Sequence, residues 1–283
     1  MSIEGALTAL SQPVNTLIEK IASGVGILYE PTRIRNNAKA QADAEKISAI
    51  SKLEIEDIQK RALIRMVNEE TIKQINMENV IDKTIPYIKH DAQTEKIEND
   101  WLIKYFEKVR SISDNDMQEL WAKILAGECN NTGSFSKMTL NIVEELDKND
   151  AQLFSSLCSC VFKIGGNEQP IIFDPNDKEY ISLGLNYEKL LHLQSLGLIS
   201  FNSITGFKQE GFGKRAIIEY FDTKIIIEFS KDSDNEFTLG NALFTNAGKQ
   251  LCKICTPMKS NEILSKTLSY YEKKDDLKYG IVK

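Results

Sequence analysis

The chain of 283 residues is acidic, with a formal net charge of −6, 42% hydrophobic residues and 27% charged residues. This length and apolar content are enough for two domains with buried cores, and the negative charge excludes the general basic surface that non-specific nucleic-acid binders use. With only six prolines and fifteen glycines, long disordered tracts are not expected.

Cysteine usage and the first residues indicate a cytoplasmic protein. The chain has five cysteines, an odd number that argues against a disulfide framework. Its opening residues carry neither a basic n-region nor an A-x-A cleavage site, so a secretory signal is not expected. The longest uncharged runs, 5–18 and 21–29, are too short to span a bilayer. We therefore expect cytoplasmic localisation, with peripheral contact at the inner membrane as the alternative.

Residues 3–28 carry a narrow apolar stripe. Its members recur at alternating steps of three and four residues: Leu7, Leu10, Val14, Leu17, Ile21, Val25 and Leu28. This spacing predicts an amphipathic helix, which Pro13 can split. Two contacts fit the stripe, either with copies of itself in a helical bundle or with a membrane surface. Because Lys20 is the only basic residue before Arg33, we prefer self-packing and keep membrane contact as the alternative.

From Thr32 to about Ile85 the sequence predicts one long charged helix or two nearly collinear helices. No proline or glycine interrupts this segment, and six alanines within it favour helix. Fifty helical residues would span roughly 75 Å, which is longer than a compact domain. We therefore expect the helix to pair with another copy of itself, as coiled coils do, and the protein to form a homo-oligomer.

The next part of the chain predicts helices and then short strands. Helical patterns run over 100–109, 113–127, 134–150 and 149–162. Four β-like runs follow at 170–173, 214–221, 223–229 and 241–245, and a further helix over 186–199 lies before the last three. Asp222 and Thr223 are the expected hairpin turn. The order helix, hairpin, strand, helix is similar to a winged-helix arrangement.

The expected fold class is therefore mainly α, with a long N-terminal helix, a helical middle domain and a small winged-helix-like α+β domain. The expected parts of the chain are an apolar amphipathic segment (1–30), a long charged oligomerisation helix (31–90), a helical core domain (91–165), the winged-helix-like domain (166–258) and a polar tail (259–283).

The stretch SDNDMQELWAKILAGE, residues 113–128, raises the question whether its acids do chemistry or build a helix. Those acids are Asp114, Asp116, Glu119 and Glu128. Ser113 followed by Asp116 resembles a capping box, and acids in a first turn complement the helix dipole. One apolar face follows: Met117, Leu120, Trp121, Ile124 and Leu125. Gly127 is expected to end the helix, and we favour the structural interpretation.

The run from Trp101 to Phe154 resembles an uncharacterised bacterial family, domain of unknown function 2806. Its D-W, D-M-Q-x-L-W-A-x-I-L-A-G-E and S-F-S elements carry the resemblance, together with QINMENVIDKTIPYI (74–88), LQSLGLIS (193–200) and LFTNAGKQLCKIC (243–255). Residues 21–46 are similar to helical proteins of the abortive-infection alpha type. The family has no established activity, so the resemblance implies a fold and no site residues.

Candidate chemistry is sparse. Cys158-x-Cys160 and Cys252-x-x-Cys255 supply the four thiolates of a structural zinc site. However, positions i and i+2 of a helix point apart, and all four lie in apolar patterns where cysteine acts as a small hydrophobe. The two histidines, His90 and His192, have no nucleophile at a motif spacing. No phosphate-binding loop or H-E-x-x-H motif is present, so no catalytic site, metal or other cofactor is expected.

The winged-helix-like part offers Lys214 and Arg215 as candidate wing contacts. Residues 186–229 hold five basic and five acidic side chains, and a neutral surface gains little from releasing counterions. We therefore do not expect nucleic acid as a partner. The leading hypothesis is a non-enzymatic helical oligomeric interaction protein with a further protein partner, and the abortive-infection resemblance alone suggests phage defence. The alternatives are a nucleic-acid-associated regulator and a hydrolase whose site assembles only in the fold.

Overall fold

A computed structural model describes residues 11–32, 49–50 and 56–282. The chain forms two compact units, Met1–Leu140 and Asn141–Lys283. Leu7 and Leu10 of the predicted stripe, and most of the long helix expected before Glu56, lie outside the described residues.

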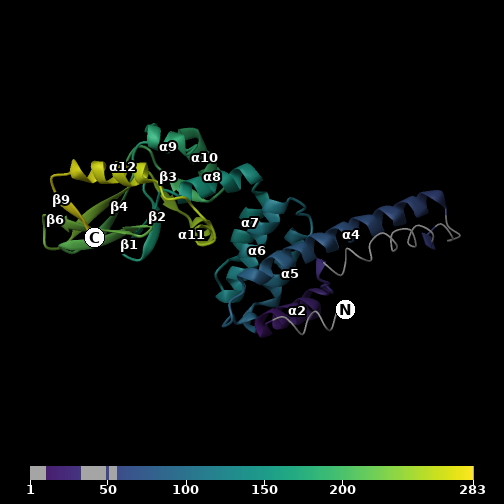
Figure 1. The fold of residues 1–283 in the computed structure, drawn as a ribbon. Coiled ribbons are helices and arrows are strands. Elements are labelled where there is room, and N and C mark those ends of the chain that lie inside the picture. The colour runs from purple at the N-terminus through teal and green to yellow at the C-terminus, as the bar shows by residue number, and fades with distance from the viewer. Residues whose placement is uncertain (1–10, 33–48, 51–55, 283) are drawn as a thin grey trace. The chain divides into compact units, whose positions relative to one another are not determined.

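The first unit is helical. Its elements are α2 (Gln12–Val25), α4 (Asp57–Thr84), η1 (Ile85–Tyr87), η2 (Thr94–Lys96), α5 (Asn99–Val109) and α6 (Asn115–Asn130), and α7 (Lys137–Glu145) contains the division between the units. Helix α4 begins at Asp57 because Glu56 is extended and forms a capping box with Gln59. At about 1.5 Å per residue its 28 residues span roughly 42 Å. Its last third packs on α5 and α6 (Figure 1).

The second unit is α+β. Its helices are α8 (Lys148–Cys158), α9 (Lys178–Ser182), α10 (Tyr187–Ser195), α11 (Asn246–Cys252) and α12 (Asn261–Glu272). Its strands are β1 (Val161–Ile164), β2 (Asn167–Pro170), β3 (Ile199–Phe201), β4 (Phe207–Phe212), β5 (Arg215–Tyr220), β6 (Thr223–Phe229), β7 (Asn235–Gly240), β8 (Ala242–Phe244) and β9 (Leu277–Val282).

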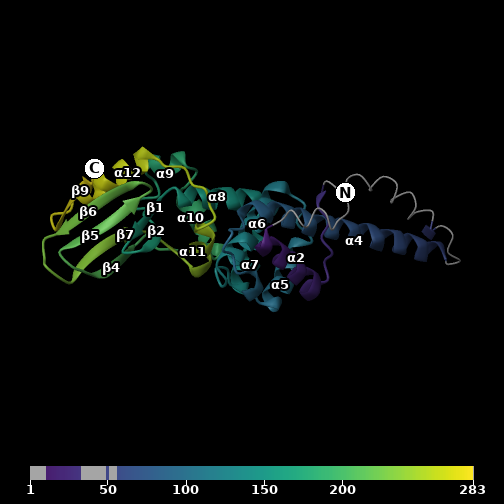
Figure 2. The ribbon, with the colours of Figure 1, turned by 60° about the horizontal axis from the view of Figure 1, so that its bottom comes forward.

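One antiparallel sheet organises this unit, with strand order β2-β1-β5-β6-β9 (Figure 2). Two further strand pairs, β3-β8 and β4-β7, are separate from it. Alternation along β5 and β6 buries Ile218 and Ile225, which face each other in register. Helix α12 packs on β9, and its Tyr271 ring stacks on Phe237 of β7 with centroids 4.8 Å apart. The core therefore lies between the inner face of the sheet, α12 and the β4-β7 pair.

The prediction of a mainly α chain with a winged-helix-like end is wrong. Five antiparallel strands, drawn from residues 161–282, build the second unit. The helical middle part is not a unit of its own, because the division at Leu140 falls inside α7. Helix α8 stops at Cys158, so that Phe162 and Ile164 can enter the sheet core. The sheet also needs β9, which lies in the segment predicted to be a polar tail.

Two local predictions are also corrected. The β5-β6 hairpin is present, but its two-residue loop is Phe221–Asp222, with Phe221 in the left-handed region at φ 51°. Asp114, rather than Ser113, caps α6, and its side chain accepts from the backbone N–H groups of Asp116 and Met117.

Candidate functional site

The family-like motif builds an aromatic core in the first unit. The indole N–H of Trp101 donates to the carbonyl of Phe135 at 2.7 Å, and the Tyr105 hydroxyl donates to the carbonyl of Trp121 at 2.7 Å. The Tyr105 ring lies 5.2 Å from Trp101 and 5.4 Å from Trp121, measured between centroids. The side chains of Trp101, Tyr105, Trp121 and Phe135 are all buried. The D-W, L-W-A and S-F-S elements therefore meet in one place, and what they make there is packing.

Gly127 and Glu128 fix the loop that follows α6. Gly127 does not end the helix, which continues to Asn130; a Cβ at this position would lie 2.6 Å from Cε2 of Phe135. The buried Glu128 carboxylate accepts from the N–H of Gly133 at 2.6 Å and of Phe135 at 3.0 Å. Burial raises the pKa of Glu128, and these hydrogen bonds oppose that shift.

The acids of the motif thus have structural partners. Asp114 caps the helix, Glu128 holds the 133–135 loop, and Glu119 accepts a hydrogen bond from the Tyr87 hydroxyl. This agrees with the structural interpretation of residues 113–128.

In the described part of the predicted N-terminal stripe, three residues are packed inside the first unit. Val14, Leu17 and Ile21 are buried where α2 lies against α5 and η2. Val25 is half-buried, and Leu28 is 78% exposed. A bundle or membrane contact through the three buried residues would therefore require α2 to leave the unit. No helix in the described part of the chain combines the length and the hydropathy needed to cross a membrane.

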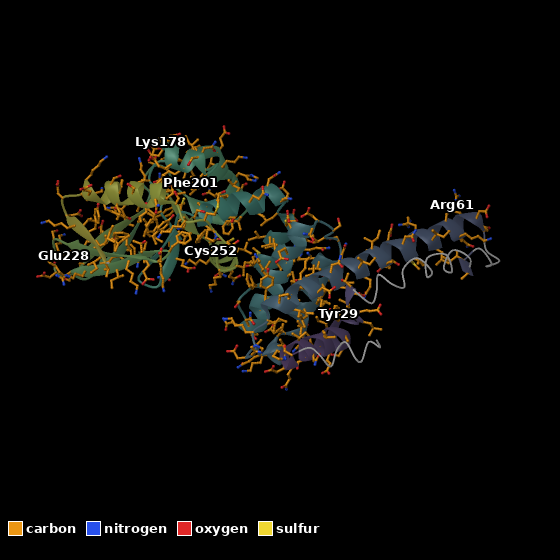
Figure 3. The ribbon with its side chains drawn as sticks, viewed as in Figure 1. Tyr29, Arg61, Lys178, Phe201, Glu228 and Cys252 are labelled. Atoms are coloured by element: carbon orange, nitrogen blue, oxygen red, sulfur yellow. The ribbon has the colours of Figure 1, made fainter. Side chains whose placement is uncertain are left out.

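The first two thirds of α4, before Asn76, present apolar side chains to solvent. All buried residues of this helix lie between Asn76 and Thr84. In the earlier turns Ile58 is 59%, Met66 54% and Ile72 57% exposed. Arg61 marks this end of the helix in Figure 3. This surface is the least covered apolar stretch of helix within the described residues of the first unit.

The two candidate wing contacts are already paired with acids. The Lys214 ammonium lies 3.3 Å from the Asp232 carboxylate, and the Arg215 guanidinium lies 3.3 Å from Glu228, its cross-strand partner. These exposed pairs contribute little to stability, but they leave little net positive charge for a phosphate backbone.

His192 forms a hydrogen bond with a carboxylate that resembles part of a catalytic triad. Its Nε2 lies 2.6 Å from Oδ1 of Asp150, which joins α10 to α8. The Ser195 hydroxyl donates to the backbone carbonyl of His192 rather than to the ring. Within the described residues the ring has no serine or cysteine partner, and His90 lies in an exposed turn after η1. The geometry therefore offers the histidines no nucleophile.

Three of the five cysteines meet in the second unit. The Cys158 thiol, at the end of α8, is hydrogen-bonded to both Cys252 and Cys255, at and just after the end of α11. The two hydrogen bonds, together with burial, raise the pKa of Cys158. Cys160 is separate and completely buried, and burial raises its pKa strongly. No group of three or more His, Cys, Asp or Glu in the described part of the chain is placed to hold a metal ion.

A pocket of about 260 Å³ opens on this thiol cluster. Its lining includes Cys158, Cys252, Lys253, Lys163, Glu168 and Glu219. The last three form a cross-strand row on β1, β2 and β5, in which the Lys163 ammonium lies 3.9 Å from the Glu219 carboxylate. Two thiols, two lysines and two glutamates therefore line the same pocket.

A sequence model of the family described as Protein of unknown function (DUF2806) matches residues 60–268, nearly three quarters of the chain. The chain belongs to this family. No curated protein and no solved structure matches it.

The matched range of the DUF2806 family begins inside α4 and ends inside α12, so it includes the aromatic core and the thiol pocket. Sequence reasoning identified the family motif but missed the thiol cluster, because it grouped Cys160 with the other three cysteines as a zinc set. The useful signal was Cys252-x-x-Cys255 at the end of a short helix, since both thiols then lie near one helix end.

Proposed function

We propose that this member of the DUF2806 family is a non-enzymatic interaction protein that self-associates through the first two thirds of α4. The observation that carries the proposal is the exposure of Ile58 and Ile72, each more than half accessible to solvent. Isolated helices are marginal in water, so most helical stability comes from packing an apolar face. A second copy of α4 would supply such packing.

The spacing of the exposed residues supports a helix pair. Steps of four and three residues lead along one seam: Ile58, Ala62, Arg65, Glu69 and Ile72. These steps are those of a coiled-coil seam. Ile58 and Ile72 lie fourteen residues apart and therefore only about 40° apart around the helix.

The centre of the seam is polar. Arg65 and Glu69 form an ion pair at 2.7 Å between the two isoleucines. In an antiparallel pair with Ile58 of one copy opposite Ile72 of the other, the two Arg65 side chains lie opposite each other, and each has Glu69 of its own helix one turn away. Polar seam residues fix register at a cost in stability. Each buried isoleucine contributes only about 1 kcal/mol here, so we expect a weak, concentration-dependent pair.

Sedimentation velocity over a wide concentration range tests the proposal. We expect the mass to rise from 32.0 kDa toward twice that value, and Ile58→Glu/Ile72→Glu to remain a monomer at every concentration. Ile103→Glu/Ile204→Glu is the matched control, because it changes two exposed isoleucines outside α4 in the same way. A monomeric wild type, or equal loss of association in the control, would refute the proposal.

A role in phage defence is the accompanying hypothesis. It rests on the resemblance of residues 21–46 to abortive-infection alpha-type proteins. If self-association serves defence, cells that express the wild type resist phage infection, and cells that express Ile58→Glu/Ile72→Glu do not. Equal plaque counts with and without the wild-type protein across a panel of phages would contradict it.

A further inference from the structure

The thiol cluster of the second unit is independent of α4 and has no part in the proposed self-association. Cys158 is buried, whereas Cys252 and Cys255 are half-buried. The pocket reaches both Cys158 and Cys252, so a small molecule can approach the pair from solvent. Figure 3 marks Cys252 at the end of α11. Hydrogen-bonded thiols that share an open pocket are placed for oxidation to a disulfide, which needs an S–S distance of about 2.05 Å.

We propose that Cys158 and Cys252 form a thiol oxidation site that a peroxide converts to an intramolecular disulfide. In the first step the Cys252 sulfur attacks the peroxide; an S–O bond forms and the O–O bond breaks. The leaving oxygen takes the thiol proton and departs as water, or as an alcohol from an organic peroxide. Cys252 is then a sulfenic acid.

In the second step the Cys158 sulfur attacks the sulfenic sulfur. An S–S bond forms, the S–O bond breaks, and the hydroxyl leaves as water with the Cys158 proton. Two thiols lose two electrons in total and one peroxide molecule gains them, so no other oxidant is required. A thiol reductant of the cell reverses the reaction by thiol–disulfide exchange.

The different surroundings of the cysteines assign these roles. Cys252 lies half-exposed beside Lys253 in the pocket wall, where peroxide arrives first. Cys158 is buried, so it is the less accessible of the two thiols to peroxide and acts second, on the sulfenic acid of Cys252. Cys160 is completely buried away from the pocket lining and stays reduced.

The disulfide would join the end of α8 to the end of α11, two helices far apart in the sequence. Closing a long loop restricts the unfolded chain. Oxidation should therefore raise the melting temperature of the second unit by on the order of 5–10 °C, and a reductant should restore the original value. Peroxide would thus change the stability of this unit without changing α4.

Peptide mapping of the full chain tests the assignment. The reduced protein is treated with hydrogen peroxide, free thiols are blocked, and trypsin then releases residues 149–163, 250–253 and 254–259 as separate peptides. We expect a link between 149–163 and 250–253 that dithiothreitol removes. Because 149–163 contains both Cys158 and Cys160, the same link must persist in Cys160→Ala.

Two variants decide the outcome. Cys158→Ala and Cys252→Ala should each abolish the link and the rise in melting temperature; the second residue is half-buried, so its variant is expected to fold even if the first is unstable. A link between 250–253 and 254–259, a disulfide between two chains, or retention of all five thiols would overturn the proposal. Ile58→Glu/Ile72→Glu should oxidise like the wild type, which separates this site from the proposed function of α4.

Discussion

Replacing Glu128 by alanine tests whether this buried acid of the family motif stabilises the fold. The wild-type carboxylate accepts from the backbone N–H of Gly133 at 2.6 Å and of Phe135 at 3.0 Å. Hydrogen bonds to a charged group contribute about 1.5–3 kcal/mol each, and a buried donor left without a partner costs about 1–3 kcal/mol. Burying the carboxylate offsets part of this gain. We therefore expect Glu128→Ala to lower the free energy of unfolding by about 3 kcal/mol.

Tryptophan fluorescence in urea measures this loss in the first unit, which contains Glu128. The chain has two tryptophans, Trp101 and Trp121, and both lie in the aromatic core of the first unit. With a slope of about 2 kcal/mol per molar urea, the midpoint should fall by about 1.5 M. Glu119→Ala is the matched control, because this half-buried acid on the same helix holds only the exposed Tyr87 hydroxyl. Equal midpoints for the two variants would refute the reasoning.

The pKa of Glu128 adds a pH test. Burial raises this pKa above its usual 4.5 in the folded chain. The folded state therefore binds the proton more readily than the unfolded state, and the associated stability is fully present below the unfolded pKa and lost as pH rises through the folded pKa. Glu128→Gln removes this dependence. The stability of the wild type relative to Glu128→Gln should thus be greater at about pH 4.5 than at about pH 8; the opposite trend would contradict the direction of the shift.

Three further predictions follow from the fold. Gly240→Ala should lower the free energy of unfolding of the second unit by more than about 3 kcal/mol, measured by thermal circular dichroism, because its Cβ would lie 2.3 Å from the carbonyl oxygen of Ile172 at a φ of 91°. Lys214→Glu/Arg215→Glu should leave duplex DNA binding at physiological salt as weak as in the wild type; sub-micromolar binding that the variant loses would revive the regulator hypothesis. Leu17→Glu should lower the tryptophan-monitored unfolding midpoint, because Leu17 is completely buried; a wild type that floats with anionic liposomes and a stable variant that does not would favour the membrane alternative.

The sequence by itself determined several local features. Periodic apolar residues identified α5 and α6, and β-branched runs identified the β5-β6 hairpin. The family motif was recognisable as a pattern, and two of its acids, Asp114 and Asp116, were expected at the start of a helix, where both lie. These features are readable because helices and hairpins are stabilised by contacts between residues close in the sequence, so their signals lie within short windows.

Only the tertiary structure decided which distant segments pair. The sheet places β1 beside β5 and β9 beside β6, and nothing in strands of four to seven residues specifies such partners. The sequence predicts that Gly127 ends a helix, but in the fold Gly127 lies inside α6 and leaves room for the Phe135 ring. Likewise the sequence grouped Cys158 and Cys252 with two other cysteines as a possible zinc set. In the fold, α8 and α11 bring the thiols of Cys158 and Cys252 together without Cys160. Strand partners, close packing and side-chain clusters depend on long-range contacts, and these exist only once the chain has folded.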